Sequence, residues 1–582
     1  MWRIVRRVAS LAFVALGIAC AGNRIPNIPD TWPFPMGAVP VRADHGMVVS
    51  TDAYASRVGV EILEVGGNAV DAAVAVSFAL AVVNPEAGNI GGGGFMVLRL
   101  AGGTAAALDY RERAPLAASR DMYLDARGNL TDRSVKGHLA VGVPGTVAGL
   151  WEAHRRYGSL PWRDLLAPAI ALAEGFEVRG RLARSLSAYA AALAEFSATA
   201  TIFLPEGRPP RVGEQLTQSD LARTLRRIRE HGRDGFYLGE TSDQIVAEMH
   251  RGGGMITHED LTSYQASWRE PIRFTYRGYS VISMPPPSSG GVTLAATAKI
   301  LEGYPLGSLV WHSPQHVHLL AEAWKRAYAD RNALLGDPDF VAMPIARMIS
   351  AEYGAERRAS IRMDRATPSE QVGPGLSAPK ADGNTTHFSV VDSKGNAVAV
   401  TTTINSFYGI HAVVPGAGFF LNNEMDDFAA KPGTANQFGL VQGEANAIAP
   451  GKRMLSAMTP AIVVNPKGKL FYVTGSPGGA TIITNVFQNI SNIIDFGMTV
   501  TQAVNAPRLH HQHLPDRIDY ERASLSAETI RALEAMGHKL RDSYDPKELY
   551  PYIGDIQAIM VMPDGTLQGA SDPRRGGAAI GY

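Results

Sequence analysis

The segment around Asn384 and Thr385 has the residue types for a self-generated nucleophile. Residues 365–384 are rich in proline and glycine, which predicts an exposed linker, and a strand pattern begins directly after them. If the chain is cut between Asn384 and Thr385, Thr385 gains a free α-amine beside its own hydroxyl. An α-amine has an ordinary pKa of about 7.7–8, so it can accept the hydroxyl proton and activate the threonine. Taken alone, the tripeptide 384–386 is better explained as a strand start or a chance glycosylation sequon.

Three other patterns point away from common chemistries. Gly91-Gly92-Gly93-Gly94 lacks the lysine and hydroxyl of a phosphate loop, so we expect a glycine-lined turn between buried elements. His510-His511-Gln512-His513 resembles a metal-binding tract, but its spacing suits few coordination geometries. No Gly-x-Ser-x-Gly elbow lies at a strand-to-helix turn, which argues against an ordinary serine hydrolase. We predict no metal and no cofactor.

The elements that must position Thr385 are strands. Alternating runs flank a turn at 392–396, and further strand pairs are expected over Ala461–Thr474 and around 563–565. A glycine-rich loop at 475–479 leads into a predicted helix, Ala480–Asp495. The part of the chain that starts at Thr385 is therefore expected to be strand-rich.

The part before Thr385 is predicted to be helix-rich. A strand from Met47 is followed by helical patterns over Tyr54–Leu63 and Ala69–Val83, and the second is apolar nearly all round, as a core helix is. Residues 145–250 are largely helical in pattern, and two more helices are expected at Thr293–Leu301 and Pro314–Ala333.

Many separate motifs occur together in the order typical of one family. They are 66–73 (GGNAVDAA), 88–95 (GNIGGGGF), 109–112 (DYRE), 285–291 (PPPSSGG), 328–331 (YADR), 384–392 (NTTHFSVVD), 421–428 (LNNEMDDF) and 474–479 (TGSPGG). From about residue 44 to Tyr582 the chain resembles the γ-glutamyltranspeptidases. The resemblance implies an α+β fold, the four-layer αββα sandwich of the N-terminal-nucleophile hydrolases. It also implies a precursor that cuts itself into a large subunit, 44–384, and a small subunit, 385–582.

The resemblance also assigns residues that hold a zwitterionic γ-glutamyl head group. Arg111 would bind the carboxylate, since a guanidinium matches it bidentately, and Glu424 and Asp427 would bind the ammonium. The spacing of three is consistent with one turn or a tight loop, and the family motif selects Asp427 over Asp426. From composition alone, a surface pair of Arg111 with Glu112 and solvated loop acids remain alternatives.

Further residues are expected around the nucleophile. Thr403 and Asn405 share strand parity, so both would project from one face, Thr403 toward the amine or hydroxyl of Thr385 and Asn405 toward the donor head. Thr403 could equally be a routine strand residue. Gly478 and Gly479 lie before a helix start, where free amide N–H groups could stabilise an oxyanion by roughly 3–4 kcal/mol per donor. A plain glycine entry to the helix is the alternative.

The chain departs from the family pattern at three places. Ser456 is followed by Ala457 where the family usually has two serines for the donor carboxylate, so one hydroxyl is lost. Phe438 stands where many members have a lid tyrosine and cannot donate a hydrogen bond, although 429–453 has the length of a lid loop. Glu424 replaces a glutamine found in some members, and an acid should suit an ammonium better.

The composition and the N-terminal segment limit where the protein can act and what it can bind. Lys+Arg and Asp+Glu both total 55, and this zero formal charge argues against nucleic-acid binding. One cysteine excludes an intrachain disulfide. Arginines precede an apolar run, Val8–Cys20, typical of a signal segment at 1–20, followed by a tether at 21–43. We expect an exported protein, either periplasmic or anchored as a lipoprotein through Cys20.

The sequence thus predicts a self-processing γ-glutamyltransferase and glutathione hydrolase. Thr385 would attack the γ-glutamyl amide of glutathione or related compounds, and water or an amino acid would resolve the ester. Two alternatives remain: a related acylase, for example of β-lactam side chains, kept open by Ala457, and a non-catalytic anchored binding protein of the same fold.

Overall fold

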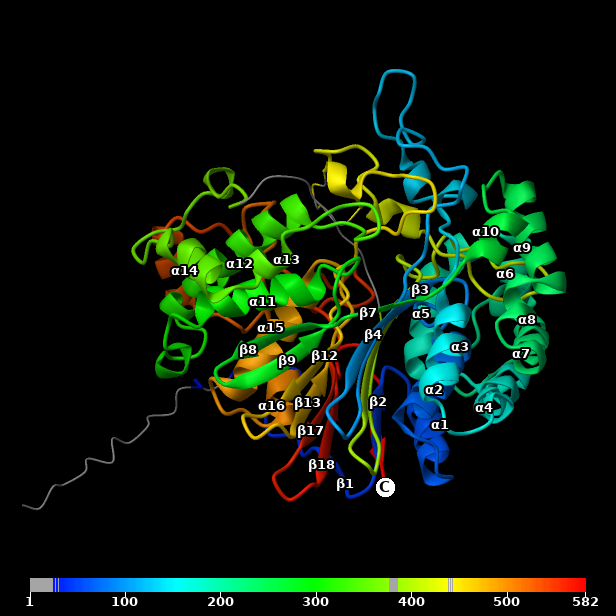
Figure 1. The fold of residues 1–582 in the computed structure, drawn as a ribbon, viewed down its shortest axis with the longest axis horizontal. Helices are drawn as coiled ribbons and strands as arrows, with labels where there is room; N and C mark the ends of the chain where they lie inside the picture. Colours follow the sequence, from blue (N-terminus) through cyan, green and yellow to red (C-terminus); the bar gives the residue numbers. More distant parts are fainter. Residues whose placement is uncertain are drawn as a thin grey trace, which may run out of the picture.

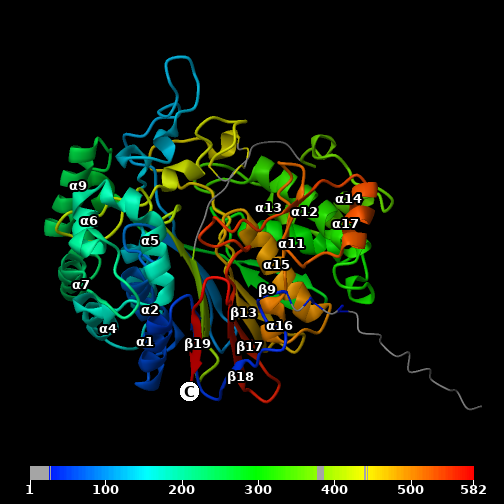
Figure 2. The ribbon, with the colours of Figure 1, turned by 180° about the vertical axis from the view of Figure 1, so that it is seen from behind.

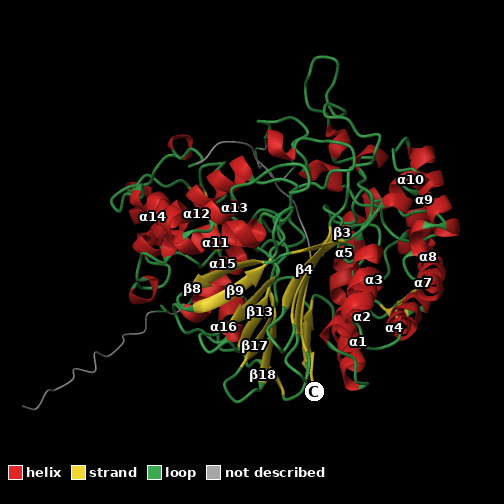
Figure 3. Cartoon of the chain, viewed as in Figure 1, coloured by secondary structure: helices red, strands yellow, loops and turns green. Residues whose placement is uncertain are grey.

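Two seven-stranded sheets lie face to face, with helices covering the outer face of each (Figures 1 and 3). The computed structural model describes residues 25–375 and 386–582, except residues 27, 30, 438, 440 and 442. This arrangement is the α+β, four-layer αββα sandwich predicted above. Residues 1–24, with the expected signal segment and Cys20, lie outside the described residues, as do Asn384 and Thr385. Among the helices described, none has the length and apolarity to span a bilayer.

The first sheet contains the two later predicted hairpins. Its strand order is β1 (Val41–Ala43), β18 (Leu567–Ser571), β17 (Gln557–Val561), β13 (Leu470–Thr474), β12 (Ala461–Val464), β9 (Tyr279–Ser283) and β8 (Ile272–Tyr276). Its neighbouring strands are antiparallel. The expected strand pairs around 465–469 and 563–565 are confirmed as β12–β13 and β17–β18.

The second sheet contains the hairpin that follows Thr385. Its order is β19 (Ala578–Gly581), β2 (Met47–Ser50), β10 (Thr386–Val391), β11 (Ala397–Thr403), β3 (Gly93–Arg99), β4 (Ala105–Tyr110) and β7 (Ser267–Arg269). The β10–β11 hairpin inserts between β2 and β3, which come from the first part of the chain. Both sheets therefore combine strands from before and after position 385, an arrangement that the local patterns did not indicate.

Two helical layers enclose the sheets (Figures 1 and 2). The layer outside the second sheet contains α1 (Ala53–Glu64), α2 (Ala69–Val83), α3 (Thr146–Tyr157), α4 (Trp162–Glu174), α5 (Gly180–Ala194), α6 (Ser197–Phe203), α7 (Ser219–His231), α8 (Asp234–Tyr237), α9 (Gly239–Gly252) and α10 (His258–Ser263). The layer outside the first sheet contains α11 (Gly290–Leu301), α12 (Pro314–Leu334), α13 (Ile345–Met348), α14 (Ala351–Ala359), α15 (Thr481–Ile494), α16 (Val500–Asn505) and α17 (Ala527–Ala535). Small ladders add β5–β6 (Phe176–Glu177 and Gln215–Leu216) and β14–β15–β16 (Leu509–His510, Ile518–Tyr520 and Leu540–Asp542).

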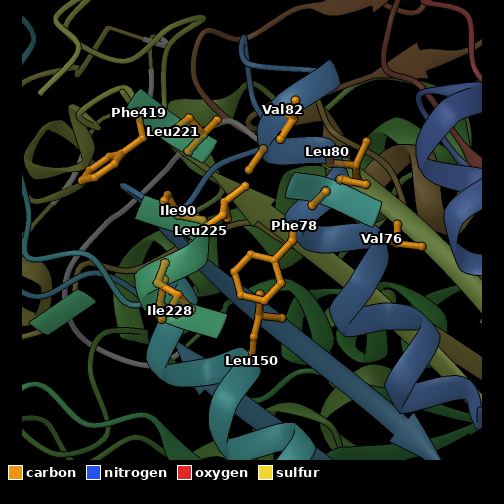
Figure 4. Packing of buried hydrophobic residues seen from close by; sticks show 14 of the residues in the cluster. Val76, Phe78, Leu80, Val82, Ile90, Leu150, Leu221, Leu225, Ile228 and Phe419 are labelled. Atoms are coloured by element: carbon orange, nitrogen blue, oxygen red, sulfur yellow. The ribbon is translucent and has the colours of Figure 1, made fainter. Parts of the chain in front are cut away.

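Helix α2 is a core helix, as its sequence predicts. All of its residues are buried, and its many alanines let neighbouring elements approach closely. Asn68 accepts hydrogen bonds from the Val70 and Asp71 amides, while the Asp71 carboxylate accepts from the Asn68 amide, which caps the helix start. Figure 4 shows α2 packed against α3 and α7 through Val76, Phe78, Leu80, Val82, Leu150, Leu221, Leu225 and Ile228.

The glycine run 91–94 combines the predicted close-packed bend, at 91–92, with the first two residues of β3. A Cβ atom on Gly91 would lie 2.1 Å from the Phe420 carbonyl oxygen, and one on Gly92 would lie 2.1 Å from the Thr403 carbonyl oxygen. Both separations are far below contact distance, so only glycine fits. The run therefore lets β3 start directly against the end of β11.

Candidate active site

The described part of the site begins where β10 begins. Thr386 pairs with Thr402 of β11, and its hydroxyl lies 3.4 Å from that of Thr51. Thr403 is the last residue of β11 and is fully buried. The start of β10 and the end of β11 therefore meet at one end of the second sheet, where the chain that carries Thr385 enters.

Asn405 lies near Thr403, although not for the predicted reason. Strand β11 ends at Thr403, and Asn405 has a left-handed backbone with φ of 68°. The expectation that strand parity places both side chains on one face is therefore wrong. A turn joins the two instead: the Asn405 amide donates to Thr403 Oγ1 at 2.8 Å, and Asn405 Nδ2 donates to the Asn423 carbonyl at 2.9 Å. Asn423 in turn precedes the acidic segment.

The structure brings Arg111, Glu424 and Asp427 together. Arg111 Nη1 donates to Glu424 Oε2 at 2.6 Å and to Glu112 Oε2 at 3.1 Å, and Nη2 contacts the Asp427 carboxylate. All four side chains are 0% exposed, so the alternatives of a surface arginine and solvated acids are excluded. Glu424–Asp427 forms a single 3-10 turn, η6, which explains the spacing of three.

Asp426 points elsewhere. Its carboxylate accepts hydrogen bonds from the Ser134 hydroxyl at 2.9 Å and from the Gln437 amide at 3.3 Å. Burial raises the pKa of Asp426. Of the two adjacent aspartates, Asp427 is thus the one that contacts Arg111.

The cluster around Arg111 carries an excess of buried acid. Three carboxylates surround one guanidinium, and Glu112 Oε1 and Glu424 Oε1 accept no hydrogen bond from the residues that the structure describes. Burial raises the pKa values of Glu112 and Glu424, with Arg111 opposing the shift in each case. Although burial opposes its charge, the nearby Glu424, Glu112 and Asp427 raise the pKa of Arg111. A cation that entered this cluster would be stabilised by charges already desolvated.

Glu112 and two carbonyl contacts were not assigned from the sequence. Glu112 was considered only as a surface partner of Arg111, although its place beside Arg111 in the motif could have indicated it. Arg111 Nε donates to the Met454 carbonyl at 3.2 Å, and the Tyr264 hydroxyl donates to the Arg111 carbonyl at 2.7 Å. These contacts hold both the backbone and the guanidinium of Arg111 in place.

Gly478 and Gly479 form the connection between β13 and α15. Their φ angles are 132° and 58°, which side chains other than glycine rarely adopt. The Gly478 carbonyl accepts from the Thr481 amide, and the Gly479 carbonyl accepts from the Ile482 amide. Neither glycine amide donates a hydrogen bond within the described chain. Two N–H groups at a helix start are thus available to an anion, as the oxyanion prediction requires.

Ser456 is buried in a loop two residues after Met454, whose carbonyl accepts from Arg111. Its amide donates to the Pro287 carbonyl at 2.8 Å, and its carbonyl accepts from the Ser289 amide at 2.7 Å and hydroxyl at 2.6 Å. The Ser456 hydroxyl accepts from the Met458 amide at 3.2 Å, which leaves its own proton available. Ala457 is fully buried and adds no donor from its side chain. Phe438 lies outside the described residues, whereas Lys431 of the lid region donates to the Gly128 carbonyl at 2.6 Å.

The histidine tract is tied into the protein by ordinary contacts. His510 Nδ1 lies 2.9 Å from Thr484 Oγ1, His511 Nε2 lies 3.4 Å from Asp516, and His513 Nε2 lies 2.9 Å from the Ser369 carbonyl. Burial lowers the pKa of His510 to about 4. In the described residues, no three acidic, histidine or cysteine side chains group as metal ligands would.

The similarity to known proteins extends over nearly the whole chain. The model of the family described as gamma-glutamyltranspeptidase matches residues 55–582. This chain belongs to the γ-glutamyltranspeptidase family. The match includes both the Arg111 cluster and the Gly478–Gly479 loop.

Individual relatives agree with this assignment. The glutathione hydrolase proenzyme of Escherichia coli (strain K12) is 47% identical over 574 residues, covering 98% of this chain and 97% of that protein. The acylase ACY 1 proenzyme of Pseudomonas sp. (strain V22) is 40% identical, covering 96% of each. Among solved structures, a cephalosporin acylase from Bacillus halodurans superposes with a TM-score of 0.83 at 30% identity, covering 95% of this chain and 99% of that one.

Proposed function

We propose that the protein is a self-processing γ-glutamyltransferase and glutathione hydrolase. The observation that carries the proposal is the buried Arg111 cluster, where one guanidinium and excess carboxylate lie side by side. A γ-glutamyl donor presents one carboxylate and one ammonium, and such a cluster complements both charges. The relatives named as glutathione hydrolase proenzymes support the same activity.

In this proposal, the donor head displaces contacts within the cluster. Its carboxylate takes Arg111, aided by the Ser456 hydroxyl, while its ammonium binds Glu424 and Asp427. Asn405 holds the head from the turn after β11. The exchange conserves charge pairing, because each protein group loses one partner and gains another of the same sign.

The chemistry is assigned to Thr385. Its hydroxyl first attacks the Asn384 carbonyl, which breaks the C–N bond to Thr385, frees the α-amine and leaves an ester. Water then cleaves the ester to give the Asn384 carboxylate and the free Thr385 hydroxyl. That amine then takes the hydroxyl proton as the oxygen attacks the γ-glutamyl carbonyl, and Thr403 orients the pair. Gly478 and Gly479 donate to the oxyanion, and the departing amine takes the proton. Water or an amino acid then cleaves the γ-glutamyl ester.

The decisive test concerns Thr385. Thr385→Ala should remain one chain and be inactive, whereas wild type should give bands of about 40 and about 20 kDa on a denaturing gel, as the cut position implies. Thr385→Ser, which keeps a hydroxyl, should still be cut, and N-terminal sequencing of the smaller piece should begin at residue 385. Normal processing of Thr385→Ala would refute the assignment.

A related acylase activity is the second candidate, favoured by Ala457 and by the similarity to acylases. Loss of one hydroxyl weakens the hold on a donor carboxylate. Comparing glutathione with a glutaryl amide, which lacks the α-ammonium, separates the two. Preference for glutathione supports the γ-glutamyl function, and preference for the glutaryl amide supports the acylase.

We also propose that the protein is exported to the periplasm, on the strength of the signal-like residues 1–20 and the tether at 21–43. In one form of this proposal, Cys20 becomes a lipidated first residue. Mass spectrometry of the mature N-terminus distinguishes the forms. A lipid mass on Cys20 supports anchoring, and an unmodified start beyond Cys20 supports a free periplasmic enzyme.

A further inference from the structure

A pocket lies at the opposite end of the sandwich from the candidate active site. Its cavity volume is about 520 Å³, and it lies among the turns 392–396, 465–469 and 562–566 and the end of β3. These turns join the strands at the lower end of both sheets in Figure 1. Since β11 spans seven residues, the pocket is roughly 20 Å from Thr403. The catalytic proposal uses no residue of this pocket.

Arg99 is the buried charge of this pocket. It is the last residue of β3, and Phe95 and Val97 share its strand parity and belong to the core between the sheets. The Arg99 side chain therefore lies at the open end of the intersheet space, and the residue is only 7% exposed.

No carboxylate of the described residues pairs with Arg99. Its guanidinium donates to the Gly468 carbonyl at 3.1 Å and the Leu100 carbonyl at 3.4 Å, and it forms no ion pair with any described residue. Burial and the nearby Arg273 lower the pKa of Arg99. By contrast, the buried Arg574 pairs with both Glu521 and Asp572. A desolvated guanidinium without a counter-charge favours a bound anion.

Three lysines at the mouth of the pocket reinforce the positive charge. Lys394, Lys467 and Lys469 line it, are exposed, and have no ion pair with a described carboxylate. Two acids also line the pocket. The Asp392 carboxylate is used inside the hairpin, where it accepts from the Lys394 and Asn396 amides, among others.

Asp44 and Asp392 oppose Arg99 and the three lysines, and His45 lies beside Asp44. The four cations outnumber the two acids, so the lining carries a net positive charge. The amides of all three lysines are already used, since those of Lys467 and Lys469 donate to Asn465 Oδ1 and that of Lys394 donates to Asp392. Recognition would therefore come from the charged side chains.

We propose that this pocket binds a small multivalent anion bearing phosphate or carboxylate groups. The Arg99 fork matches either group bidentately, and the lysines supply mobile point charges for the others. The volume lies within the roughly 300–1,000 Å³ of small-molecule sites. The site is distinct from the γ-glutamyl site, and the proposal does not depend on it.

The test is calorimetric titration of the processed wild-type protein with pyrophosphate and, separately, with citrate at low salt. We expect saturable one-to-one binding of at least one anion. Arg99→Gln and the double variant Lys467→Gln/Lys469→Gln should weaken binding about tenfold or more, the effect of losing one charge-assisted contact. Lys539→Gln, which removes a lysine outside the pocket, should leave the affinity unchanged.

The two probes also identify the ligand class: binding of pyrophosphate alone indicates phosphate groups, and binding of citrate alone indicates carboxylates. Arg99→Lys keeps the positive charge and should bind the anion more tightly than Arg99→Gln. This difference would show that the weak binding of Arg99→Gln comes from the lost charge and not from a folding defect. The proposal is overturned if neither anion gives saturable binding, or if the pocket variants bind as tightly as Lys539→Gln.

Discussion

Arg111 is already saturated with carboxylates before any donor binds. Three acids contact it, and none of these side chains is exposed. In the proposed donor complex, the donor carboxylate would take the place of one acid on Arg111, and that acid would then be available to the donor ammonium.

Arg111→Lys should impair donor binding because lysine cannot form the planar fork. We expect kcat/KM for glutathione to fall about 100-fold, corresponding to roughly 3 kcal/mol, mostly through KM. Steady-state kinetics of the processed enzyme measure this. Arg522→Lys, at an exposed ion pair with Asp542, should change little; an Arg111→Lys enzyme with wild-type KM would contradict the role.

Glu112 should make stability depend on pH. Burial raises its pKa in the folded state, so ionising it costs more in the folded protein than in the unfolded chain. Ionised Glu112 therefore destabilises the folded protein. This loss of folding stability is absent at acid pH and grows as pH rises from the ordinary glutamate pKa through the raised pKa of Glu112. Glu112→Gln should therefore gain stability relative to wild type as pH rises. Melting temperatures across pH 5 to 9 check this, and a difference that shrinks with pH would contradict it.

The sequence identified Arg111, Glu424 and Asp427 as members of this cluster, but neither Glu112 nor the burial of all four side chains. Arg111 lies 313 residues from Glu424 and 316 from Asp427, so local pattern alone could not exclude solvated side chains. Only the motif resemblance joined them. Asn405 shows the reverse case, in which a local rule was applied too far. The period-two argument assumed that the strand continues to Asn405, but the strand ends at Thr403 and Asn405 has a left-handed backbone.

At the scale of elements, the loop before α15 contains Gly478 and Gly479, whose amides are the proposed oxyanion donors. Gly479 has φ of 58°, and its carbonyl is bound to the first turn of the helix. The Gly478 and Gly479 amides, which donate to no described residue, therefore lie in a loop that is fixed to the helix start. Glycine is required because a side chain would strain this backbone.

Gly479→Ala should lower kcat more than it raises KM, because the strained loop would misplace an oxyanion donor. A loss of about 100-fold in kcat is expected. Gly497→Ala is the matched control: Gly497 has φ of 68°, and a Cβ there meets no atom within 4 Å. If both variants lose activity equally, general strain explains the loss and the oxyanion role fails.

Helix α2 should tolerate little loss of volume. Leu80 is 0% exposed in the cluster that joins α2 to its neighbours, and Leu80→Ala should cost about 2–5 kcal/mol. The apparent melting temperature should drop by several degrees, as differential scanning would show. Val65→Ala, at a side chain 69% exposed, should shift it little. Equal shifts would mean that α2 contributes no special packing.

Hairpins and helices were predictable because their signals are local. The turn at 392–396 and the apolar run 69–83 gave β10–β11 and α2 with nearly correct ends. Strand order was not predictable: β10 pairs with β2, whose residues 47–49 are more than 300 positions earlier. Such pairings depend on which sheet edges are free in the folded molecule, which short patterns do not encode.

At the scale of the whole molecule, the portions of the chain before and after position 385 both contribute strands to each seven-stranded sheet. The ladders β1–β18, β9–β12, β2–β19, β2–β10 and β3–β11 all join a strand before position 385 to one after it. Cleavage at 384–385 would therefore leave the pieces hydrogen-bonded along five strand pairs.

The processed pieces should remain together without any covalent link. Gel filtration in native buffer should give one peak near the mass of the intact chain, with both bands present in equal amounts. High salt should not separate them, because backbone ladders and apolar contacts are weakly screened. Recovery of either piece alone in native buffer would contradict the shared-sheet arrangement.

The interwoven ladders also make maturation a one-way event. Before the cut, every partner strand is tethered to its neighbour, and folding proceeds within a single molecule. After the cut, a denatured enzyme must find its other half by diffusion, so recovery becomes dependent on concentration and competes with aggregation. The working lifetime of the mature enzyme is then set by its unfolding rate, because the covalent link that made folding intramolecular is gone.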